Sequence, residues 1–332
     1  MTFNIYVYFS MNSRNYSIDV LKFICAGFIV FIHTDWQFHQ EFLPLTRFAV
    51  PCFFMISGYL LFDKEQKTIF PERIKRNIIH IGKILLWATL FYMIWDEVLY
   101  ITSHDGHFWV PPAIRWIKML VLNVPLFGHH LWYLFAYVYV LFIIIIVARN
   151  DKWKFLYYMI PLLLIPHIIL LLSGRYLSIF LVRNFLFLGL PFFAIGTFIK
   201  AKSSSICKIK PYSVFLFFGI VVFSVSSLLE RQILLSLGKF AVRELYISSF
   251  FLAICLFLLT LTFESKNKSW LSEMGEKNSL YIYIFHPVFV YCCRYIFNHA
   301  NLSEVYMYIA PVVVLASTLV FVKCLRLLKI IK

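Results

Sequence analysis

The stretch LWYLFAYVYVLFIIIIVA, which occupies residues 131–148, contains no charged side chain. A helix rises about 1.5 Å per residue, so about 20 apolar residues cross a hydrocarbon layer about 30 Å thick. An apolar stretch of about this length without charges is the pattern of a transmembrane helix. Residues 131–148 therefore predict that the chain spans a membrane.

The whole chain shares this apolar character. Hydrophobic residues make up 61% of the 332 residues and charged residues only 14%, against roughly a quarter charged in an ordinary soluble domain. So little polar surface cannot cover a soluble body of this size. The sequence predicts an all-α integral membrane protein, a bundle of about ten transmembrane helices. We place the spans near residues 17–37, 45–62, 77–95, 131–148, 155–173, 181–199, 212–229, 245–263, 279–297 and 305–322.

Two regions are expected to depart from straight spans. The second range contains Pro51 and the Ser57-Gly58 pair, which interrupt helices, so a half-inserted helix is the alternative there. The longest segment between spans, residues 96–130, contains Asp96, a His-His pair and several aromatic residues. We expect it to form a re-entrant or capping structure over the bundle.

The charge pattern predicts the orientation. The net charge of +15 would suggest a nucleic-acid partner in a soluble protein, but here most lysines and arginines occupy short segments between spans. Counted on alternate sides of the ten spans, 20 of them share the side of the N-terminus and 8 lie on the other. This predicts a multi-pass protein of the bacterial inner membrane with both termini cytoplasmic, with membrane lipids and no nucleic acid as partners.

The predicted domain organisation follows from the spans. Residues 1–16 form a cytoplasmic N-terminal segment, residues 17–322 the transmembrane domain and residues 323–332 a basic cytoplasmic tail. Scattered cysteines, mostly inside apolar stretches, show no metal-ligand spacing and no disulfide framework, so we interpret them as packing residues and predict no metal. They are Cys25, Cys52, Cys207, Cys255, Cys292, Cys293 and Cys324.

The first predicted span carries the ionisable side chains of Asp19, Lys22 and His33. Such groups are costly in lipid and are therefore functional candidates. At about 100° per residue, the step from Lys22 to His33 covers about three turns, which places both on one helix face about 16 Å apart. Histidine is the commonest general base near neutral pH, and Asp19 can orient or neutralise Lys22. The alternative is that Lys22 reaches the lipid headgroups and His33 only packs.

A second candidate site precedes the third span. Arg73 and Arg76 are neighbours on one helix face, and their paired guanidinium groups suit a polyphosphate. The alternative is an ordinary cluster of positive charge at the cytoplasmic surface. His286 in a Tyr-rich span and Trp132 at the start of the fourth span are less specific signals, because aromatic residues at a span entrance usually mark the membrane interface.

Six segments in a fixed order resemble the acyltransferase-3 family of membrane-bound glycan O-acyltransferases. Each is weak alone, and the set extends from residue 17 to residue 287. They are Ser17-Ile-Asp19-Val-Leu-Lys22 followed by His33, VPCFFMISGY at 50–59, Arg73-x-x-Arg76, HLWYL at 130–134, GLPFFAIG at 189–196 and SLYIYIFHP at 279–287.

The resemblance implies a ten-span domain that takes an acyl group from a coenzyme A thioester, acetyl-CoA or another short acyl-CoA, in the cytoplasm. The acceptor would be a hydroxyl of a surface polysaccharide or a lipid-linked glycan. The family's basic-residue-x10-His motif falls on Lys22 and His33, with His33 as general base and Asp19 beside Lys22. No appended extracytoplasmic domain is expected.

The resemblance also assigns binding residues to the coenzyme and to the acceptor substrate. Arg73 and Arg76 are assigned to the coenzyme, together with Ser57 and Tyr59. The substrate side is expected at Trp132, His130 and His286. Direct transfer and a covalent acyl-enzyme both remain open.

A transporter or membrane sensor built on the same fold is the alternative function. Many transporters have paired inverted halves, and the sequence shows no matched halves.

Overall fold

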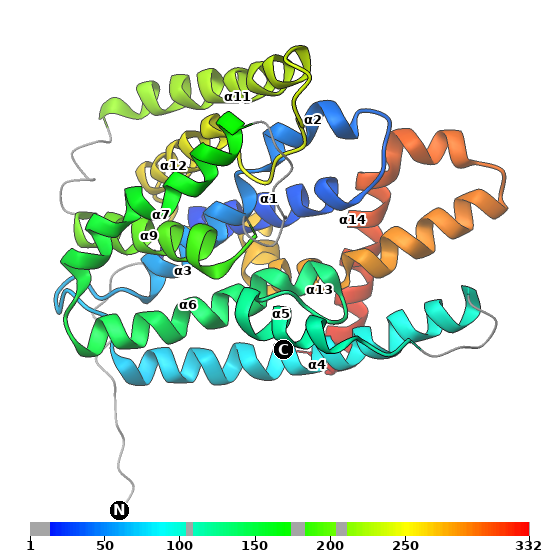
Figure 1. Ribbon diagram of the computed structural model, residues 1–332, viewed down its shortest axis with the longest axis horizontal. Helices are drawn as coiled ribbons and strands as arrows, with labels where there is room; N and C mark the ends of the chain where they lie inside the picture. Colours follow the sequence, from blue (N-terminus) through cyan, green and yellow to red (C-terminus); the bar gives the residue numbers. More distant parts are fainter. Residues whose placement is uncertain (1–13, 104–108, 174–182, 204–210, 332) are drawn as a thin grey trace, which may run out of the picture.

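The computed structural model describes residues 14–103, 109–173, 183–203 and 211–331, and helices dominate these ranges (Figure 1). No strand occurs in them apart from a single bridge between Asp63 and Thr68. The all-α class is therefore confirmed. Cys207 and most of the predicted N-terminal segment 1–16 lie outside the described residues.

The described elements include long helices, shorter helices and two tight helical turns. In chain order they are α1 (Tyr16–His33), α2 (His39–Thr46), α3 (Ala49–Leu61), α4 (Pro71–Ser103), α5 (Ala113–Leu122), the 3-10 turn η1 (His129–Leu131), α6 (Trp132–Arg149), α7 (Trp153–Ser173), the π-helical turn η2 (Phe185–Gly189), α9 (Leu190–Ala201), α11 (Ser213–Ser236), α12 (Ile247–Thr262), α13 (Trp270–His299) and α14 (Ser303–Leu327).

Within the described ranges, 7 segments are long and apolar enough to cross a membrane. They are α1, α2 with α3, α4, η1 with α6, α11, α13 and α14. Shorter apolar helices occupy the other three predicted ranges, at Trp153–Ile169, Phe185–Ala201 and Ile247–Thr262. A membrane protein is thus confirmed, and the number ten stays a prediction.

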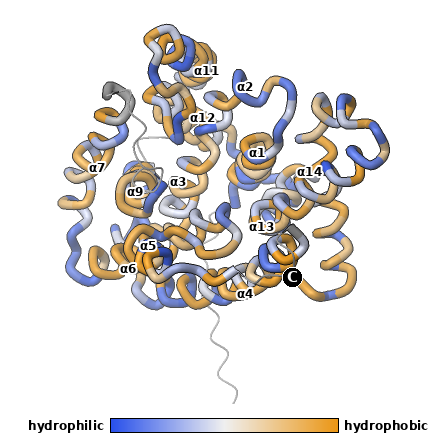
Figure 2. Tube along the Cα trace, turned by 45° about the vertical axis from the view of Figure 1, so that its right-hand side comes forward, coloured by the Kyte–Doolittle hydropathy of each residue, from blue (hydrophilic) through white to orange (hydrophobic). Residues whose placement is uncertain are grey.

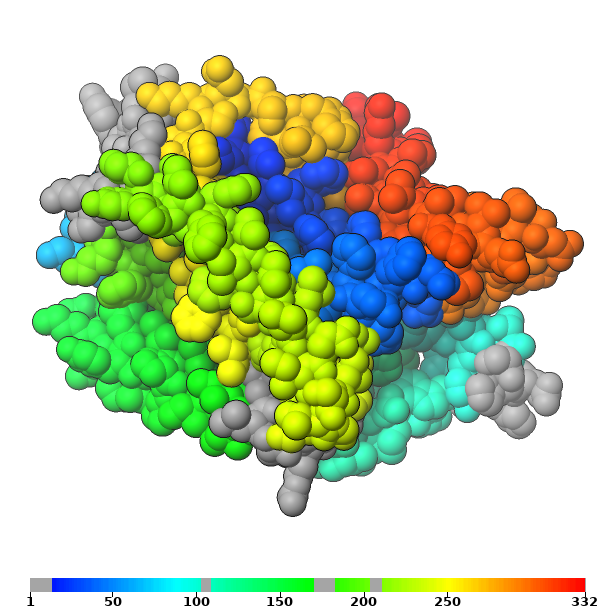
Figure 3. Space-filling view, turned by 90° about the horizontal axis from the view of Figure 1, so that it is seen from above, coloured from blue at the N-terminus to red at the C-terminus, as the bar shows by residue number. Residues whose placement is uncertain are grey.

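The outer helices carry the apolar surface that a bilayer requires. In Figure 2 apolar residues cover outward faces as well as inward ones, and in Figure 3 α11 runs across the front of the molecule. On α11 the exposed fractions of Val214 and Phe215 are 73% and 71%. A soluble protein would not expose so large an apolar patch, so this face is suited to lipid.

The second predicted range, 45–62, is interrupted, but not at the positions expected. The chain bends earlier, between Thr46 and Ala49, and α3 continues unbroken through Pro51 and Gly58. Pro51 lies in the first turn of α3, where its missing N–H costs no hydrogen bond. Gly58 lies directly against α9, where a Cβ would overlap the carbonyl oxygen of Phe193. The glycine therefore serves close helix packing and not a break.

The two longest helices, α4 and α13, begin well before their predicted ranges. The third range, 77–95, is the middle of α4, which begins at Pro71, a residue suited to a first helical turn. The ninth range, 279–297, lies within α13, which begins at Trp270. Ser269 caps this helix through a reciprocal pair of hydrogen bonds with Ser272, at 2.9 and 3.2 Å. Both helix starts lie in polar sequence, so a search for apolar stretches does not find them.

Helix α1 lies inside the bundle and packs closely along α13 (Figure 1). At the point of closest approach, a Cβ on Gly275 would overlap the carbonyl oxygen of Asp19. This contact fixes the two helices at one end, and the opposite end of α1 carries His33.

Gly275→Ala is expected to destabilise the protein by about 1 to 3 kcal/mol, because the added methyl group forces α1 and α13 apart. Gly82→Ala is the matched control, since a Cβ at Gly82 has no neighbour within 4 Å and alanine favours a helix. Unfolding of both variants in detergent measures the difference. Equal stability of the two variants would show that the close packing at Gly275 is unimportant.

Candidate active site

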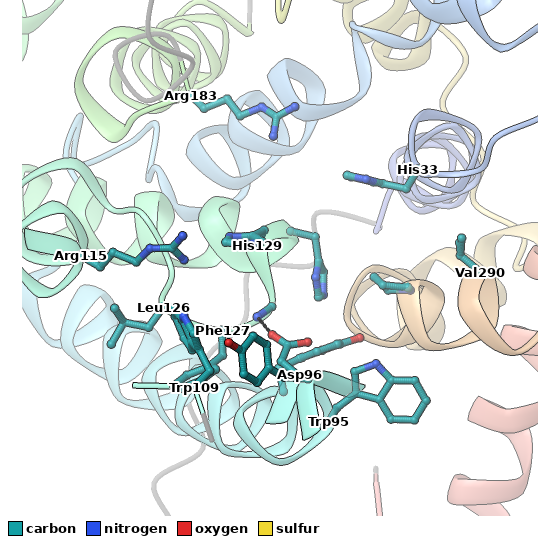
Figure 4. Close-up of a pocket in the computed structure, with 15 residues that line it drawn as sticks. His33, Trp95, Asp96, Trp109, Arg115, Leu126, Phe127, His129, Arg183 and Val290 are labelled. Carbon is teal, nitrogen blue, oxygen red and sulfur yellow. Dashed lines mark hydrogen bonds between the residues drawn. The ribbon is translucent and has the colours of Figure 1, made fainter. Parts of the chain in front are cut away.

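A cavity of about 510 Å³ opens at the end of the bundle where α1 ends. Its walls come from α1, α4, α5, the segment around η1 and α13 (Figure 4). Trp95 and Trp109 give it apolar surfaces, and Asp96, Arg115 and Arg183 give it charged groups. A concave site of this size, with aromatic walls and a few polar groups, is the usual form of a small-ligand site.

Part of the predicted capping segment, 96–130, contributes to this cavity. Its residue Gly128 donates its N–H to Asp96 Oδ2 at 2.8 Å, which ties the segment before η1 to α4. Arg115 of α5 lies with its guanidinium carbon 4.9 Å from the centre of the Trp109 ring. The described part of the segment therefore lines the cavity, as a capping structure would.

His33 is the last residue of α1. Thr34 follows in an extended conformation, and its N–H and hydroxyl both donate to the carbonyl oxygen of Val30, each at 3.0 Å. The chain turns away here and leaves the His33 ring at the cavity wall. The ring is partly exposed, and no residue in the described ranges forms a hydrogen bond with it. A neutral imidazole so placed can accept a proton from a bound hydroxyl.

Two more histidines lie beside His33. The ring centre of His286 is 5.1 Å from that of His33 and 5.4 Å from that of His130. His286 Nδ1 lies 3.0 Å from the carbonyl oxygen of Ile282, and His130 Nε2 lies 3.1 Å from that of Ile284. A carbonyl only accepts, so each of these nitrogens carries the proton and donates it. In the neutral rings the other nitrogen remains an acceptor, and His286 Nε2 is buried without a partner in the described structure.

Tyrosines fix the frame of this histidine cluster. Tyr92 donates its hydroxyl to the carbonyl oxygen of Ile284 at 2.7 Å, the same oxygen that accepts from His130. Tyr283 donates to the carbonyl oxygen of His130. These bonds link α4, η1 and α13, so three elements distant in sequence hold the rings in place.

An ion-pair trio adjoins the cluster and consists of Arg47, Arg183 and Glu244. One Glu244 oxygen lies 2.6 Å from Arg183 Nη2 and the other 3.2 Å from Arg47 Nη1. The side chains of Arg47, Glu244 and Arg183 are 7%, 12% and 24% exposed. Burial raises the pKa of Glu244, but the two guanidinium groups outweigh it and lower that pKa to about 2. The carboxylate is therefore ionised at any physiological pH.

Backbone contacts hold Arg183 in place. Asn123, at the end of α5, donates its side-chain amide to the carbonyl oxygens of Arg183 at 3.3 Å and Trp132 at 3.4 Å. Its side-chain oxygen accepts from the N–H of Phe185 at 3.0 Å. Asn184 caps η2 by accepting from two N–H groups. The segment that carries Arg183 is thus attached to α5, α6 and η2.

A second, small cavity of about 20 Å³ adjoins the first. His33 and Arg183 line both cavities. Tyr133, Tyr283 and Trp132 also line the small one, and the Arg183 guanidinium lies 5.9 Å from the Trp132 ring. A water molecule needs about 10 to 15 Å³, so the small cavity holds a group of one or two non-hydrogen atoms.

Asp19 and Lys22 lie at the opposite end of α1. Lys22 Nζ is 3.0 Å from Asp19 Oδ1, and Arg14 is 2.8 Å from Asp19 Oδ2. Asp19 is buried and accepts from both cations. Along the helix, Lys22 lies about 16 Å from His33, and neither Lys22 nor Asp19 lines the two cavities. The geometry pairs the two residues, and a catalytic role for them stays a prediction.

The predicted coenzyme residues lie near the end of α3 that is remote from the cavity. Arg73 donates to the carbonyl oxygens of Leu60 at 2.8 Å and Leu61 at 3.1 Å, and so caps α3. Arg76 is exposed and forms no ion pair with the described residues. Lys200 lies 4.5 Å from the ring centre of Tyr59, also at this end. Ser57 lies one turn before the last residue of α3, and its hydroxyl donates to the carbonyl oxygen of Phe53 at 2.9 Å.

The structure thus divides the predicted site residues into two sets. His33, His130, His286 and Trp132 come together around the cavities. Asp19, Lys22, Tyr59, Arg73 and Arg76 lie toward the opposite end of the bundle, and Ser57 lies between the two sets, beside Tyr133 of the small cavity. Sequence reasoning missed the trio. Arg47 and Arg183 fall inside the predicted spans 45–62 and 181–199, so the cost of charge in a membrane was a signal for both. Glu244 lies in a connecting segment, and only its contacts identify it.

The described residues contain no group of three His, Cys, Asp or Glu side chains arranged to hold a metal ion. The three histidines lie close together, but two of them direct a nitrogen to a backbone carbonyl.

Comparison with known proteins gives two matches and one negative result. A family model described as an acyltransferase domain, that of the acyltransferase-3 family, matches residues 15–325. An amino-acid racemase from Enterococcus faecalis is 25% identical over 308 residues, which cover 84% of this chain and 42% of the racemase. This chain therefore corresponds to less than half of that relative's length. No solved structure matches the chain.

Proposed function

Because this chain belongs to the acyltransferase-3 family, we propose that it is a membrane-bound O-acyltransferase that transfers a short acyl group, acetyl in particular, from cytoplasmic acyl-CoA. The acceptor is a hydroxyl of a surface polysaccharide or a lipid-linked glycan. The protein works in the bacterial inner membrane with both termini in the cytoplasm.

The observation that carries this proposal is the position of His33. Its ring lies at the wall of the large cavity and has no hydrogen-bond partner among the described residues. A histidine that only packs in a protein interior usually has its nitrogens bonded to protein groups. His33 instead has nitrogen atoms available for a bound group. It accepts the hydroxyl proton of the acceptor while the hydroxyl oxygen attacks the thioester carbonyl.

The donor binds at the opposite end of α3 in this proposal. Arg76 is exposed there beside Arg73. Lys64 and Arg73 both lie close enough to Lys200 to repel its charge, and Asp63 and Glu264 offset part of this repulsion. This concentration of positive charge suits the phosphates of coenzyme A. Val50 of α3 lines the small cavity, whereas Leu60 and Leu61 contact Arg73. The flexible arm of the coenzyme would follow α3 between these points, about 16 Å along the helix.

The direct test measures transfer of the acyl group. Membranes containing the protein are incubated with acetyl-CoA labelled in the acetyl group, and surface glycans from deletion and complemented strains are compared by mass spectrometry. We expect an acetyl increment that appears only with the gene. If the glycans are identical and neither acetyl-CoA nor succinyl-CoA is consumed, the protein is not an O-acyltransferase.

The two arginines of the coenzyme site are expected to respond differently to replacement. Arg76→Ala should raise the KM for acetyl-CoA with little effect on stability, because the side chain is exposed. Arg73→Ala should raise that KM and also destabilise the fold by about 1 kcal/mol, because the cap of α3 is lost. Arg149→Ala, at another exposed helix end, is the control. Unchanged KM values in both variants would mean that Arg73 and Arg76 do not bind the coenzyme and are only part of the positive charge at the cytoplasmic surface.

The orientation has its own test at Cys324, which is exposed near the end of α14. In a variant whose other cysteines are replaced, a membrane-impermeant maleimide should label Cys324 only after the cells are permeabilised. Asn301→Cys, in the turn before α14, should react in intact cells because it lies at the other end of that helix. Labelling of Cys324 in intact cells would reverse the proposed orientation.

Transport is the second candidate function. The racemase relative extends well beyond the aligned part, so a shared membrane domain can serve proteins with different activities. In this chain the large cavity would then bind a solute and not an acceptor. Uptake of labelled amino acids without consumption of acetyl-CoA would favour transport, and consumption of acetyl-CoA without uptake would favour transfer.

A further inference from the structure

His33 and Arg183 occupy a special position because they are shared by the two cavities. Figure 4 shows the two side chains on opposite walls, with the guanidinium and the imidazole directed toward one another. One cavity is large enough for a glycosyl unit, and the other holds only one or two non-hydrogen atoms. A group that reached from one cavity into the other would therefore lie beside both His33 and Arg183.

The position of Arg183 is restrained from two sides. Its guanidinium bonds to Glu244 at 2.6 Å, and its backbone carbonyl accepts from Asn123. A restrained donor is what electrostatic catalysis requires, because the group need not reorganise when charge develops in the transition state. A loosely held arginine would lose part of this advantage.

The charge of the trio also suits the reaction. Glu244 is ionised and is shared by two guanidinium groups, so the three groups together carry more positive than negative charge. Burial of net positive charge is costly, so the trio is a candidate for a functional role. Attack of a hydroxyl on a thioester creates a negative oxygen, and a nearby cation stabilises it.

We propose that Arg183, held in place by Glu244, stabilises the oxyanion formed when the acceptor hydroxyl attacks the acyl thioester between His33 and Arg183. This inference rests on the proposed O-acyl transfer and adds a catalytic residue to it. Arg183 contacts the reacting oxygen, and Glu244 is a positioning residue that acts through Arg183.

The bonds and charges balance in this scheme. His33 takes the proton of the hydroxyl as the new C–O bond forms, and the carbonyl π electrons move to the oxygen beside Arg183. When the tetrahedral intermediate collapses, the C–S bond breaks and the ester forms. The coenzyme leaves as a thiolate and receives the proton from the His33 imidazolium. No oxidant or further reactant is consumed.

The small cavity gives this arrangement a natural place for the acyl group. Its volume of about 20 Å³ admits a group the size of the acetyl methyl, and a longer chain would need side chains to move. The large cavity then supplies the acceptor from the His33 side.

The test uses the full-length protein in membranes and acetyl-CoA labelled in the acetyl group, with label in the glycan fraction as the readout. Arg183→Met should lower kcat by about 100- to 1,000-fold and leave the KM for acetyl-CoA unchanged, because the interaction is made only in the transition state. Arg183→Lys should retain intermediate turnover, since lysine keeps the charge but loses the planar fork. Glu244→Gln should lower kcat less than Arg183→Met does.

Chemical rescue separates catalysis from structure. Adding methylguanidinium chloride to Arg183→Ala should restore part of the turnover, whereas a purely structural defect would not respond. Arg149→Met, at the exposed end of α6, is the matched control and should keep wild-type kcat. All rates are expressed per folded protein, which is measured by thermal unfolding.

The possible outcomes are distinct. Wild-type kcat in Arg183→Met, a raised KM at unchanged kcat, or no rescue of Arg183→Ala by methylguanidinium would each overturn the role of Arg183. Those results leave the proposed function intact as long as the wild-type protein transfers acetyl groups. If the wild-type protein transfers none, the proposed function fails, and the role of Arg183 with it.

Discussion

His33→Ala is expected to lose about 10²- to 10⁴-fold in turnover while it still inserts in the membrane and still binds acetyl-CoA. The reason is that, in the proposed mechanism, the acceptor hydroxyl no longer has a base at the cavity wall. The donor phosphates, in our proposal, bind about 16 Å away at the other end of α3, so donor binding should survive. Acylation of glycan per unit of inserted protein measures the loss.

A second substitution at this position distinguishes a base from a packing residue. Glutamine has similar reach and polarity, but its amide cannot accept a proton at neutral pH. His33→Gln should therefore be as inactive as His33→Ala. His80→Ala is the control, because His80 is exposed on α4 and does not line the cavities. A fully active His33→Gln enzyme would remove His33 from the mechanism.

Glu244→Ala should be the most destabilising of the substitutions considered, by about 3 to 5 kcal/mol, because it leaves the guanidinium of Arg47, which is 7% exposed, without its carboxylate. Glu65→Ala removes a carboxylate that is 79% exposed and pairs with Lys64, so it should change stability by less than about 1 kcal/mol. Unfolding by SDS in mixed micelles compares the two variants. Similar losses in both would mean that burial of the trio has no energetic consequence.

The pH dependence of the same site has a defined sign. The folded-state pKa of Glu244, about 2, is below the usual value for a glutamate, so its contribution to stability is complete above about pH 5. The contribution decreases as the pH falls from there toward 2. The stability difference between wild type and Glu244→Gln should therefore be constant from about pH 5 to 8 and shrink in acid. A difference that changes near pH 7 would assign the titration to another group.

Sequence patterns predicted the positions of the helices more accurately than the contacts between the helices. Residues 131–148 coincide closely with α6, because a run of apolar residues without charge has few structures open to it in a membrane. The bend before α3 was placed wrongly, since Pro51 and Gly58 are compatible with helix in the first turn and at a close contact. Whether a glycine breaks a helix or admits a neighbour depends on what packs against it, and one sequence does not contain that information.

The candidate site shows the same division. His33, His130 and His286 could each be found as polar residues in or next to apolar spans, and the structure brings their rings within about 5 to 6 Å of their neighbours. The pairing of Glu244 with Arg183 joins residues 61 positions apart. Such a pair follows from the folding of the whole bundle, so no local pattern predicts it.

Because one end of α1 is fixed, the number of residues in that helix determines where His33 lies in the candidate active site. The close contact at Gly275 and the ion pairs of Asp19 hold one end of α1 in a fixed rotation. One residue inserted between Lys22 and His33 would turn the imidazole by about 100° and advance it by about 1.5 Å, and a deletion would turn it the other way. Either change would move the ring off the cavity wall without altering a single side chain in the site. The number of residues between these two positions is thus constrained more tightly than most of the residues themselves.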